Sequence, residues 1–259
     1  MNAFFPAASS SSPSASAVTW DLKTMFNASG IPADVQQHLA RVYSTLTCCV
    51  LTAALAAGAC LALGGGASDG SSWLPLLCFL GSTGGSVWLQ LEPTYNHTKR
   101  VGILLAVAAT TGVSLAALVD LALAVDPTIV ITAFLMTTLV FVCFTGSAML
   151  ATRRSYLYLG AILSSALSTM ALLNFLNIFF RSTMLYSANL YGGLVIFCGY
   201  VVFDTQMIIE KATMGDRDVL RHALELFLDF VSIFVRIMII LIKNAAKKER
   251  ASSSSKNRR

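Results

Sequence analysis

Charge is scarce in this sequence. Only 12% of its 259 residues are Asp, Glu, Lys or Arg, whereas 56% are hydrophobic and the mean hydropathy is +0.70. Soluble domains carry about 25% charged residues, so the composition argues against an ordinary soluble domain and indicates a membrane protein with several spans. The net charge of +5 does not indicate nucleic-acid binding, because seven of the eighteen Lys and Arg residues lie from Lys243 to Arg259 and most others flank apolar runs.

Patterns for metal ligation and catalysis are also missing. The six cysteines form no CxxC pair and lie within apolar runs, which favours small buried side chains over disulfides or a zinc site. The three histidines, His38, His97 and His222, lie at or beyond the ends of these runs, which favours surface positions. No GxSxG sequence supplies a serine nucleophile, and GGGASDG lacks the lysine of a phosphate-binding loop. We expect a protein that is not an enzyme.

The chain divides into three regions. Residues 1–34 include AASSSSPSASA and are predicted to form a disordered Ser/Ala-rich region. Residues 35–242 contain the apolar runs, and residues 243–259 form a basic tail. The first region lacks the basic and compact apolar segments of a cleaved signal peptide, so targeting is assigned to the first span.

Apolar runs of spanning length define the fold class. A membrane-spanning helix needs about 20 mainly apolar residues. Seven runs meet this requirement: 44–64, 73–91, 101–123, 128–150, 156–177, 184–206 and 221–242. The stretch IPADVQQHLARVY predicts a short helix that leads into the membrane, with its polar side in the headgroup region. The sequence therefore predicts an all-α polytopic membrane protein.

Basic residues favour a cytosolic N-terminus, because positive residues flank spans on the cytosolic side. The loops on that side would then hold Lys99, Arg100, Arg153, Arg154, Lys211, Arg217 and Arg221, and the opposite loops only Arg181. A seventh full span would place the basic tail outside the cytosol, against the same rule. Six spans followed by a re-entrant last segment are therefore the alternative to a seven-helix bundle.

Polar residues inside the last two apolar runs are the candidate functional groups. Asp204 interrupts GYVVFDTQMIIEK, and Glu225, Asp229, Ser232 and Arg236 follow at steps of four, three and four. These steps place the later four residues on one face of a helix. A charge inside a span costs about 2.5–3.5 kcal/mol on insertion scales, so it usually faces a partner or water. Because consecutive helices tend to be neighbours, Asp204 and Asp229 are predicted to meet inside the bundle.

Two neighbouring buried carboxyl groups suit three functions. They titrate as a unit and can sense protons, they offer the oxygen ligands that Ca²⁺ prefers, and they can act as an acid–base pair in hydrolysis. The structural alternative is an aspartate that pairs with Arg236 or caps a broken helix. The residues alone leave these alternatives open.

Five stretches of the chain are distinctive: HLARVYSTL, FTGSAMLATRRSYLYLGAILSSALS, ANLYGGLVIFCGYVVFDTQMIIEKA, GDRD and HALELFLDFVSIFVRIMIIL. Together they resemble the Bax inhibitor-1 family, the transmembrane Bax inhibitor motif proteins. The similarity extends from Val35 to Leu241, and the Ser/Ala-rich leader and Lys-rich tail look most like those of plant members. The resemblance implies an endoplasmic-reticulum membrane protein of the stress response that suppresses programmed cell death and lowers the calcium content of that store.

The resemblance also implies a fold and a site. The family fold is a bundle whose last helix is central and surrounded by six others, and its paired aspartates, here Asp204 and Asp229, form a pH-sensitive element that controls a calcium leak. A bacterial member locks its pore with an arginine of the second span that pairs with one aspartate. Here the second span, WLPLLCFLGSTGGSVWLQL, has no basic residue. Arg236 is the candidate substitute as an ion-pair partner, and Glu225 is a further partner within the polar stripe.

The predicted mechanism is a proton shared between Asp204 and Asp229 in a closed state, with Ca²⁺ favouring the deprotonated pair. Ca²⁺ is expected as the transported or regulatory ion, and no other cofactor is expected. The tail KNAAKKERASSSSKNRR predicts binding to anionic lipid or to an acidic partner such as calmodulin, or simply a solvated flank. Two other functions compete with the channel. One is a membrane scaffold that acts through protein partners, and the other is an intramembrane aspartyl hydrolase, whose GxGD signature is absent.

Overall fold

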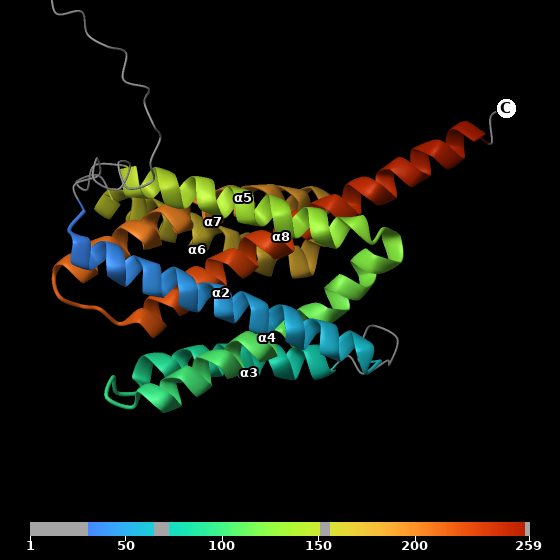
Figure 1. Ribbon diagram of the computed structural model, residues 1–259. Coiled ribbons are helices and arrows are strands. Elements are labelled where there is room, and N and C mark those ends of the chain that lie inside the picture. Colours follow the sequence, from blue (N-terminus) through green and yellow to red (C-terminus); the bar gives the residue numbers. More distant parts are fainter. Residues whose placement is uncertain (1–30, 65–72, 151–155, 257–259) are drawn as a thin grey trace, which may run out of the picture.

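The computed structural model describes residues 31–64, 73–150 and 156–256 (Figure 1). In these ranges the chain forms helices without strands: α2 (Ala33–Ala62), α3 (Trp73–Leu91), α4 (His97–Val125), α5 (Thr128–Leu150), α6 (Tyr156–Phe180), α7 (Thr183–Thr213) and α8 (Val219–Lys256). Five of the described helices are long and apolar enough to cross a membrane. The predicted all-α polytopic fold is confirmed. The predicted disorder of residues 1–30 and the basic residues Arg153 and Arg154 lie outside the described residues.

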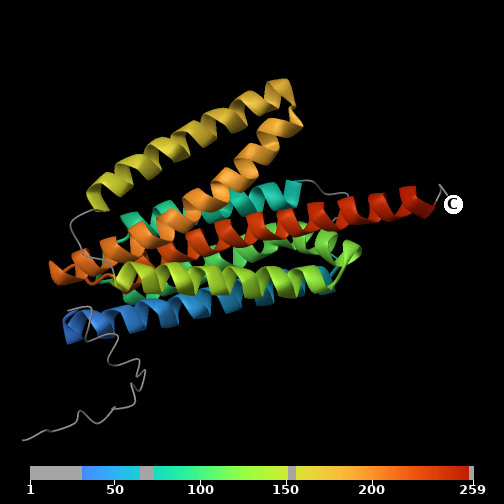
Figure 2. The ribbon, with the colours of Figure 1, turned by 90° about the horizontal axis from the view of Figure 1, so that it is seen from above.

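Short connections make successive helices run in opposite directions (Figures 1 and 2). We call the end of the bundle at which α4 and α8 begin the Arg100 end, and the end at which α4 and α5 are joined the Asp126 end. At the latter, the Asp126 carboxylate accepts hydrogen bonds from the backbone N–H (2.9 Å) and the hydroxyl (2.8 Å) of Thr128. These bonds lower the pKa of Asp126, the backbone bond contributing most. Gly215 turns the chain from α7 into α8 at a φ of 100°, which only glycine adopts without strain.

The last helix lies at the centre of the bundle. α8 packs against α7, α2, α5, α4 and α3, whereas α6 packs mainly on α7 and leans away with it (Figure 2). Side chains of α8 such as Leu226, Phe227, Ile233 and Met238 are fully buried. Large apolar side chains on the outer helices, for example Leu55, face outward, as they do in a protein surrounded by lipid.

The seven-helix bundle with a central last helix is confirmed, and the alternative with a re-entrant last segment is excluded. The last segment is not a hairpin, because α8 is one unbroken helix of 38 residues. At about 57 Å it is longer than the ~30 Å hydrocarbon core, and its final turns extend beyond the other helices (Figure 1). The stretch IPADVQQHLARVY, predicted to be a short helix leading into the membrane, is helical from Ala33 onward. It continues into the first span as α2, whose inner face is buried without interruption at Val35, Leu39, Val42, Leu46, Cys49 and Ala53.

Helices α2 and α4 approach closely at a glycine. A Cβ atom placed on Gly112 would collide with the backbone of Ala53, including its carbonyl oxygen. Backbone atoms of a packed helix cannot move aside as a flexible side chain can. In a membrane, such small residues allow helices to pack tightly where no hydrophobic force drives them together. Gly102, on the same helix, has open space around its Cα.

Replacement of Gly112 by alanine is therefore expected to destabilise the bundle by about 1–3 kcal/mol, because overpacking forces α2 and α4 apart. The measurement is the thermal unfolding midpoint in detergent, followed by circular dichroism. Gly102→Ala is the matched control and should leave the midpoint unchanged or raise it, since alanine favours the helix. Equal midpoints for the two variants would contradict the close approach at Gly112.

Candidate functional site: facing aspartates on α7 and α8

Asp204 of α7 and Asp229 of α8 are direct side-chain neighbours in the interior of the bundle. Asp229 is 5% exposed, and its Oδ2 atom is buried without a hydrogen-bond partner. Burying a carboxylate oxygen without a hydrogen-bond partner costs free energy. Binding of a proton or a cation to this oxygen would offset that cost. The structure thus brings together the two carboxyl groups that the sequence placed on neighbouring helices.

The residues after Asp204 explain why its side chain faces α8. The Thr205 hydroxyl lies 3.4 Å from the Tyr43 hydroxyl of α2, and the side-chain amide of Gln206 donates to the backbone carbonyl of Ala148 in α5. Both Thr205 and Gln206 are buried. Successive residues of a helix point about 100° apart, so three consecutive polar residues reach three different helices. The sequence DTQ therefore fixes the rotation of α7 and aims Asp204 at α8.

The polar stripe of α8 lies along the same interface. Glu225 is close enough to affect the charge of both aspartates, and its Oε1 atom lies 3.4 Å from Nε of Arg221, one turn earlier. Ser232 contributes its backbone carbonyl, which accepts a hydrogen bond of 3.0 Å from the Arg236 guanidinium.

Arg236 contacts α7 at some distance from the aspartates. Its guanidinium carbon lies 4.3 Å from the centroid of the Phe197 ring, and Gly193 leaves the space that the group occupies. Arg236 and Phe197 each lie seven residues from the aspartate on their own helix, which is about 10 Å along the helix axis. In the described chain, the guanidinium makes a cation–π contact and makes no ion pair with either aspartate.

The described residues include no group of three or more His, Cys, Asp or Glu side chains that could hold a metal ion. Asp204 and Asp229 together offer at most four carboxylate oxygens, whereas Ca²⁺ takes six to eight oxygen ligands. Water or backbone oxygens would have to complete the shell of a bound Ca²⁺. The arrangement suits transient contact with a passing cation better than a permanent metal centre.

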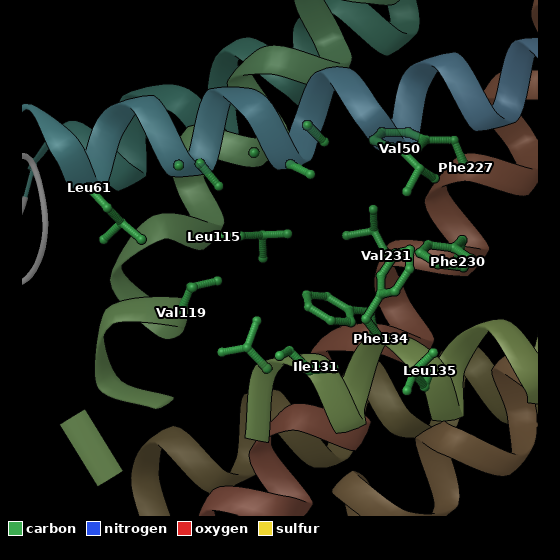
Figure 3. Close-up of a pocket in the computed structure, with 17 residues that line it drawn as sticks. Val50, Leu61, Leu115, Val119, Ile131, Phe134, Leu135, Phe227, Phe230 and Val231 are labelled. Atoms are coloured by element: carbon green, nitrogen blue, oxygen red, sulfur yellow. The ribbon is translucent and has the colours of Figure 1, made fainter. Parts of the chain in front are cut away.

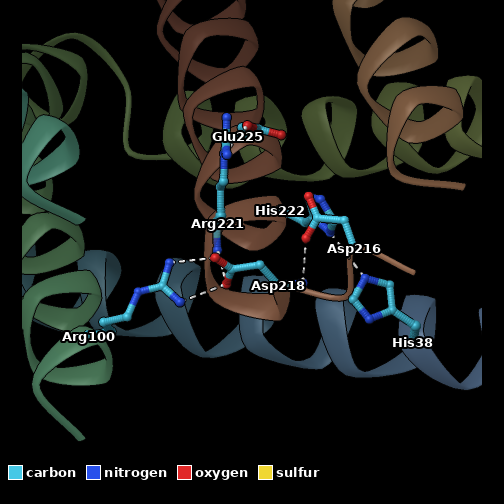
Figure 4. Close-up of polar contacts among 7 residues, drawn as sticks. All are labelled: His38, Arg100, Asp216, Asp218, Arg221, His222 and Glu225. Atoms are coloured by element: carbon cyan, nitrogen blue, oxygen red, sulfur yellow. Dashed lines mark hydrogen bonds and ion pairs between the residues drawn. The ribbon is translucent and has the colours of Figure 1, made fainter. Parts of the chain in front are cut away.

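A second polar cluster lies at the Arg100 end, and the sequence did not reveal it (Figure 4). The Arg100 guanidinium donates two hydrogen bonds to the Asp218 carboxylate, at 3.0 and 2.5 Å, and their side chains are 5% and 12% exposed. His38 Nε2 lies 3.1 Å from His222 Nδ1, and both rings are buried. The expected surface positions of these two histidines are therefore wrong, whereas His97 is exposed.

This cluster fixes the start of α8. Arg100 belongs to α4 and His38 to α2, while Asp218 and His222 lie just before and just inside α8. The pairs are separated by 118 and 184 residues along the chain, so no local pattern could have revealed them. Burial raises the pKa of Asp218, but the hydrogen bonds from Arg100 and from the backbone N–H of Arg221 outweigh it and hold the pKa below its usual range.

The lowered pKa gives the Arg100–Asp218 pair a defined pH dependence. The ionised carboxylate stabilises the fold above the ordinary carboxyl pKa of about 3.9, and this contribution is lost as the pH falls through the lower folded-state pKa. Asp218→Asn should therefore destabilise the protein by about 3–5 kcal/mol at neutral pH, because it leaves the Arg100 charge buried and unpaired. Unfolding midpoints measured at decreasing pH should converge with those of the wild type in acid.

The control is Asp34→Asn, which removes the exposed ion pair of Asp34 with Arg217, 3.5 Å apart with side chains 75% and 52% exposed. An exposed pair contributes about 1 kcal/mol or less. A destabilisation by Asp218→Asn that is no larger than that of the control, or that is the same at every pH, would contradict the role assigned to Asp218.

Comparison with known proteins identifies the family, and the matched region includes Asp204 and Asp229. The family model described as "Inhibitor of apoptosis-promoting Bax1" matches residues 35–246. Bax inhibitor 1 of Arabidopsis thaliana is 47% identical over 236 residues, covering 89% of this chain and 91% of that protein. Bax inhibitor 1 of Oryza sativa subsp. japonica is 44% identical over 261 residues, covering 99% of both chains. Bax inhibitor 1 of Homo sapiens is 44% identical over 237 residues, covering 89% of this chain and 98% of that protein. The resemblance drawn from the sequence is confirmed, and the chain belongs to the family of inhibitors of apoptosis-promoting Bax1.

Proposed function

We propose that this multi-pass membrane protein resides in the endoplasmic reticulum with a cytosolic N-terminus, suppresses programmed cell death, and conducts a pH-sensitive calcium leak. The name of its relatives, Bax inhibitor 1, supports the effect on cell death. The observation that supports the leak is the contact between Asp204 and Asp229, with one carboxylate oxygen of Asp229 buried and without a partner.

The mechanism follows from the charge of the pair. With one shared proton, the carboxyl group of one aspartate donates a hydrogen bond to the carboxylate of the other and holds α7 against α8. Loss of that proton leaves two like charges in a medium of low dielectric constant, where they repel each other strongly. The repulsion biases a two-state equilibrium toward separated helices. A Ca²⁺ ion that enters the gap neutralises the pair, so protons and Ca²⁺ compete for the same oxygens.

The aspartate pair has an acidic residue on one side and a basic residue on the other. Glu225 lies on the side of the Arg100 end, and Arg236 lies about two turns away toward the Asp126 end. A cation that approaches from the Asp126 end therefore meets the Arg236 guanidinium before the aspartates. This positive charge opposes free passage, which fits a slow leak and not a high-conductance channel.

Ca²⁺ efflux from proteoliposomes, measured from acidic to mildly alkaline pH, tests the proposal. Asp204→Asn and Asp229→Asn should each abolish the pH dependence, because an amide cannot exchange the shared proton. Glu210→Gln is the control, since it removes a similar charge from an exposed position of α7. Unchanged pH-dependent efflux in both Asn variants would refute the role of the pair.

The scaffold alternative predicts a different result in cells. The combined Asp204→Asn and Asp229→Asn variant should lose death suppression if the leak carries the function. Suppression retained by a variant without flux would assign the function to contacts with partner proteins.

Anionic lipid and calmodulin remain candidate partners of the basic tail. The structure extends α8 as a helix through Lys256 and away from the Arg100 end (Figure 2). A basic helix is the form that calmodulin and anionic membrane surfaces recognise. Helices α2 and α8 both begin at the Arg100 end. If α2 begins in the cytosol and α8 spans the membrane fully, the basic end of α8 lies on the opposite side. Protease protection of tags at the two chain ends in sealed microsomes decides which side the tail occupies. A pull-down with and without Ca²⁺ then tests calmodulin.

A further inference from the structure

An apolar cavity lies apart from the aspartates. Helices α2, α4, α5 and α8 enclose a cavity of about 430 Å³ (Figure 3). Its 17 lining residues are all Ala, Gly, Val, Leu, Ile or Phe. The volume falls within the range of about 300–1,000 Å³ that is typical of ligand pockets.

Small residues on α2 create this space. The α2 wall includes Ala53, Ala54, Ala57 and Gly58, positions that follow one face of a helix. The contact between Gly112 and Ala53 sets how closely α4 can approach, and phenylalanines of α8 form the facing wall. The cavity therefore exists because small side chains on α2 face large ones on α8 without filling the space between them.

The cavity opens sideways between α2 and α5. These two helices make no substantial contact with each other, although each contacts α8. Lining residues on both sides of the gap, Ala54 and Gly58 on α2 and Ile131 and Leu135 on α5, are exposed. In a membrane, this opening faces hydrocarbon.

The chemistry of the walls identifies the occupant. An apolar cavity excludes water, because water finds no hydrogen-bond partners there. Among the residues that the structure describes, no charged or polar side chain lines the space to receive a lipid headgroup. The occupant must therefore be a hydrocarbon chain whose polar end remains outside the cavity.

The position and length of the cavity match one acyl chain. Leu61, at one end, lies next to the last residue of α2, and Val130 and Ile131 lie in the first turn of α5, both at the Asp126 end. Val50 and Phe227 line the opposite end (Figure 3). From Val50 to Leu61 the helix rises about 16 Å, which is the depth of one leaflet of a ~30 Å hydrocarbon core.

We propose that this cavity binds one acyl chain of a phospholipid from the leaflet at the Asp126 end. The headgroup lies at the membrane surface beside the ends of α2 and α5, and the chain enters between these helices and reaches Phe227. This lipid site would remain even if the protein conducted no calcium.

Photolabelling in proteoliposomes of the full chain tests the proposal. The probe is a phosphatidylcholine that carries a diazirine on one acyl chain, either near the carbonyl or near the terminal methyl group. The probe with the diazirine near the carbonyl should label peptides that contain Leu61 or Ile131, and the probe with the deep diazirine should label those that contain Val50 or Phe227. Labelling that does not depend on diazirine depth would refute a chain lying along the cavity.

Ala57→Phe should lower the deep labelling at least about tenfold, because every methylene group displaced from the cavity removes several-fold of binding affinity. Leu115→Phe, on α4, fills the space from another wall and should have the same effect. The matched control is Ala59→Phe, since Ala59 is exposed on the same helix and does not line the cavity.

Unfolding midpoints of the three variants verify that all of them fold. If one filling variant does not fold, the other decides the test. Full labelling in the folded filling variants, or an equal loss in Ala59→Phe, would overturn the proposal. Labelling by a photoactivatable sterol but not by the phospholipid would assign the cavity to a rigid ligand instead. Cross-linking of the cavity to another protein chain would replace the lipid by a protein partner.

Discussion

The shelter of α8 from lipid is the constraint on which the rest of the bundle depends. This helix carries Glu225, Asp229 and Arg236 within its middle section, and each charged group at the centre of a bilayer costs several kcal/mol unless it faces a partner. The helix therefore cannot lie on the outside of the bundle. The more apolar helices surround it, and their exposed leucines and phenylalanines meet the lipid instead. Central placement of the last helix is thus a consequence of its own charge.

The register between α7 and α8 follows from contacts at three levels. Gly215 reverses the chain and the Arg100–Asp218 pair holds the first turn of α8 against α4. Asp204 then contacts Asp229. Phe197, seven residues before Asp204, contacts Arg236, seven residues after Asp229. Equal offsets on two antiparallel helices mean that they remain in register over this distance. A rotation of α7 would break the contacts of Thr205 and Gln206 with α2 and α5.

The sequence predicts those parts of this arrangement that follow from local pattern. Hydropathy located the helices of the bundle, and the spacing of four, three and four residues identified the polar face of α8. The neighbouring position of Asp204 and Asp229 followed from the short connection between their helices. Pairs such as His38 with His222 come from opposite ends of the chain and have no local signature. The continuous α8 was also uncertain, because the basic tail favoured a cytosolic end while the buried charges favoured a central helix, and sequence alone could not weigh these two effects.

The aspartate pair and the apolar cavity lie on opposite faces of α8. Asp229 faces α7, whereas Phe227, Phe230 and Val231, one or two residues away, line the apolar cavity. One rigid helix therefore separates a polar contact from a hydrocarbon-lined space. Protein interiors are close-packed, so in the proposed mechanism a sideways movement of α8 away from α7 must use space on the other side of α8. The cavity supplies space on that side of α8. A hydrocarbon chain in that space would resist the movement, and an empty cavity would permit it. The packing of α8 would thus couple occupancy of the cavity to the separation of the aspartates.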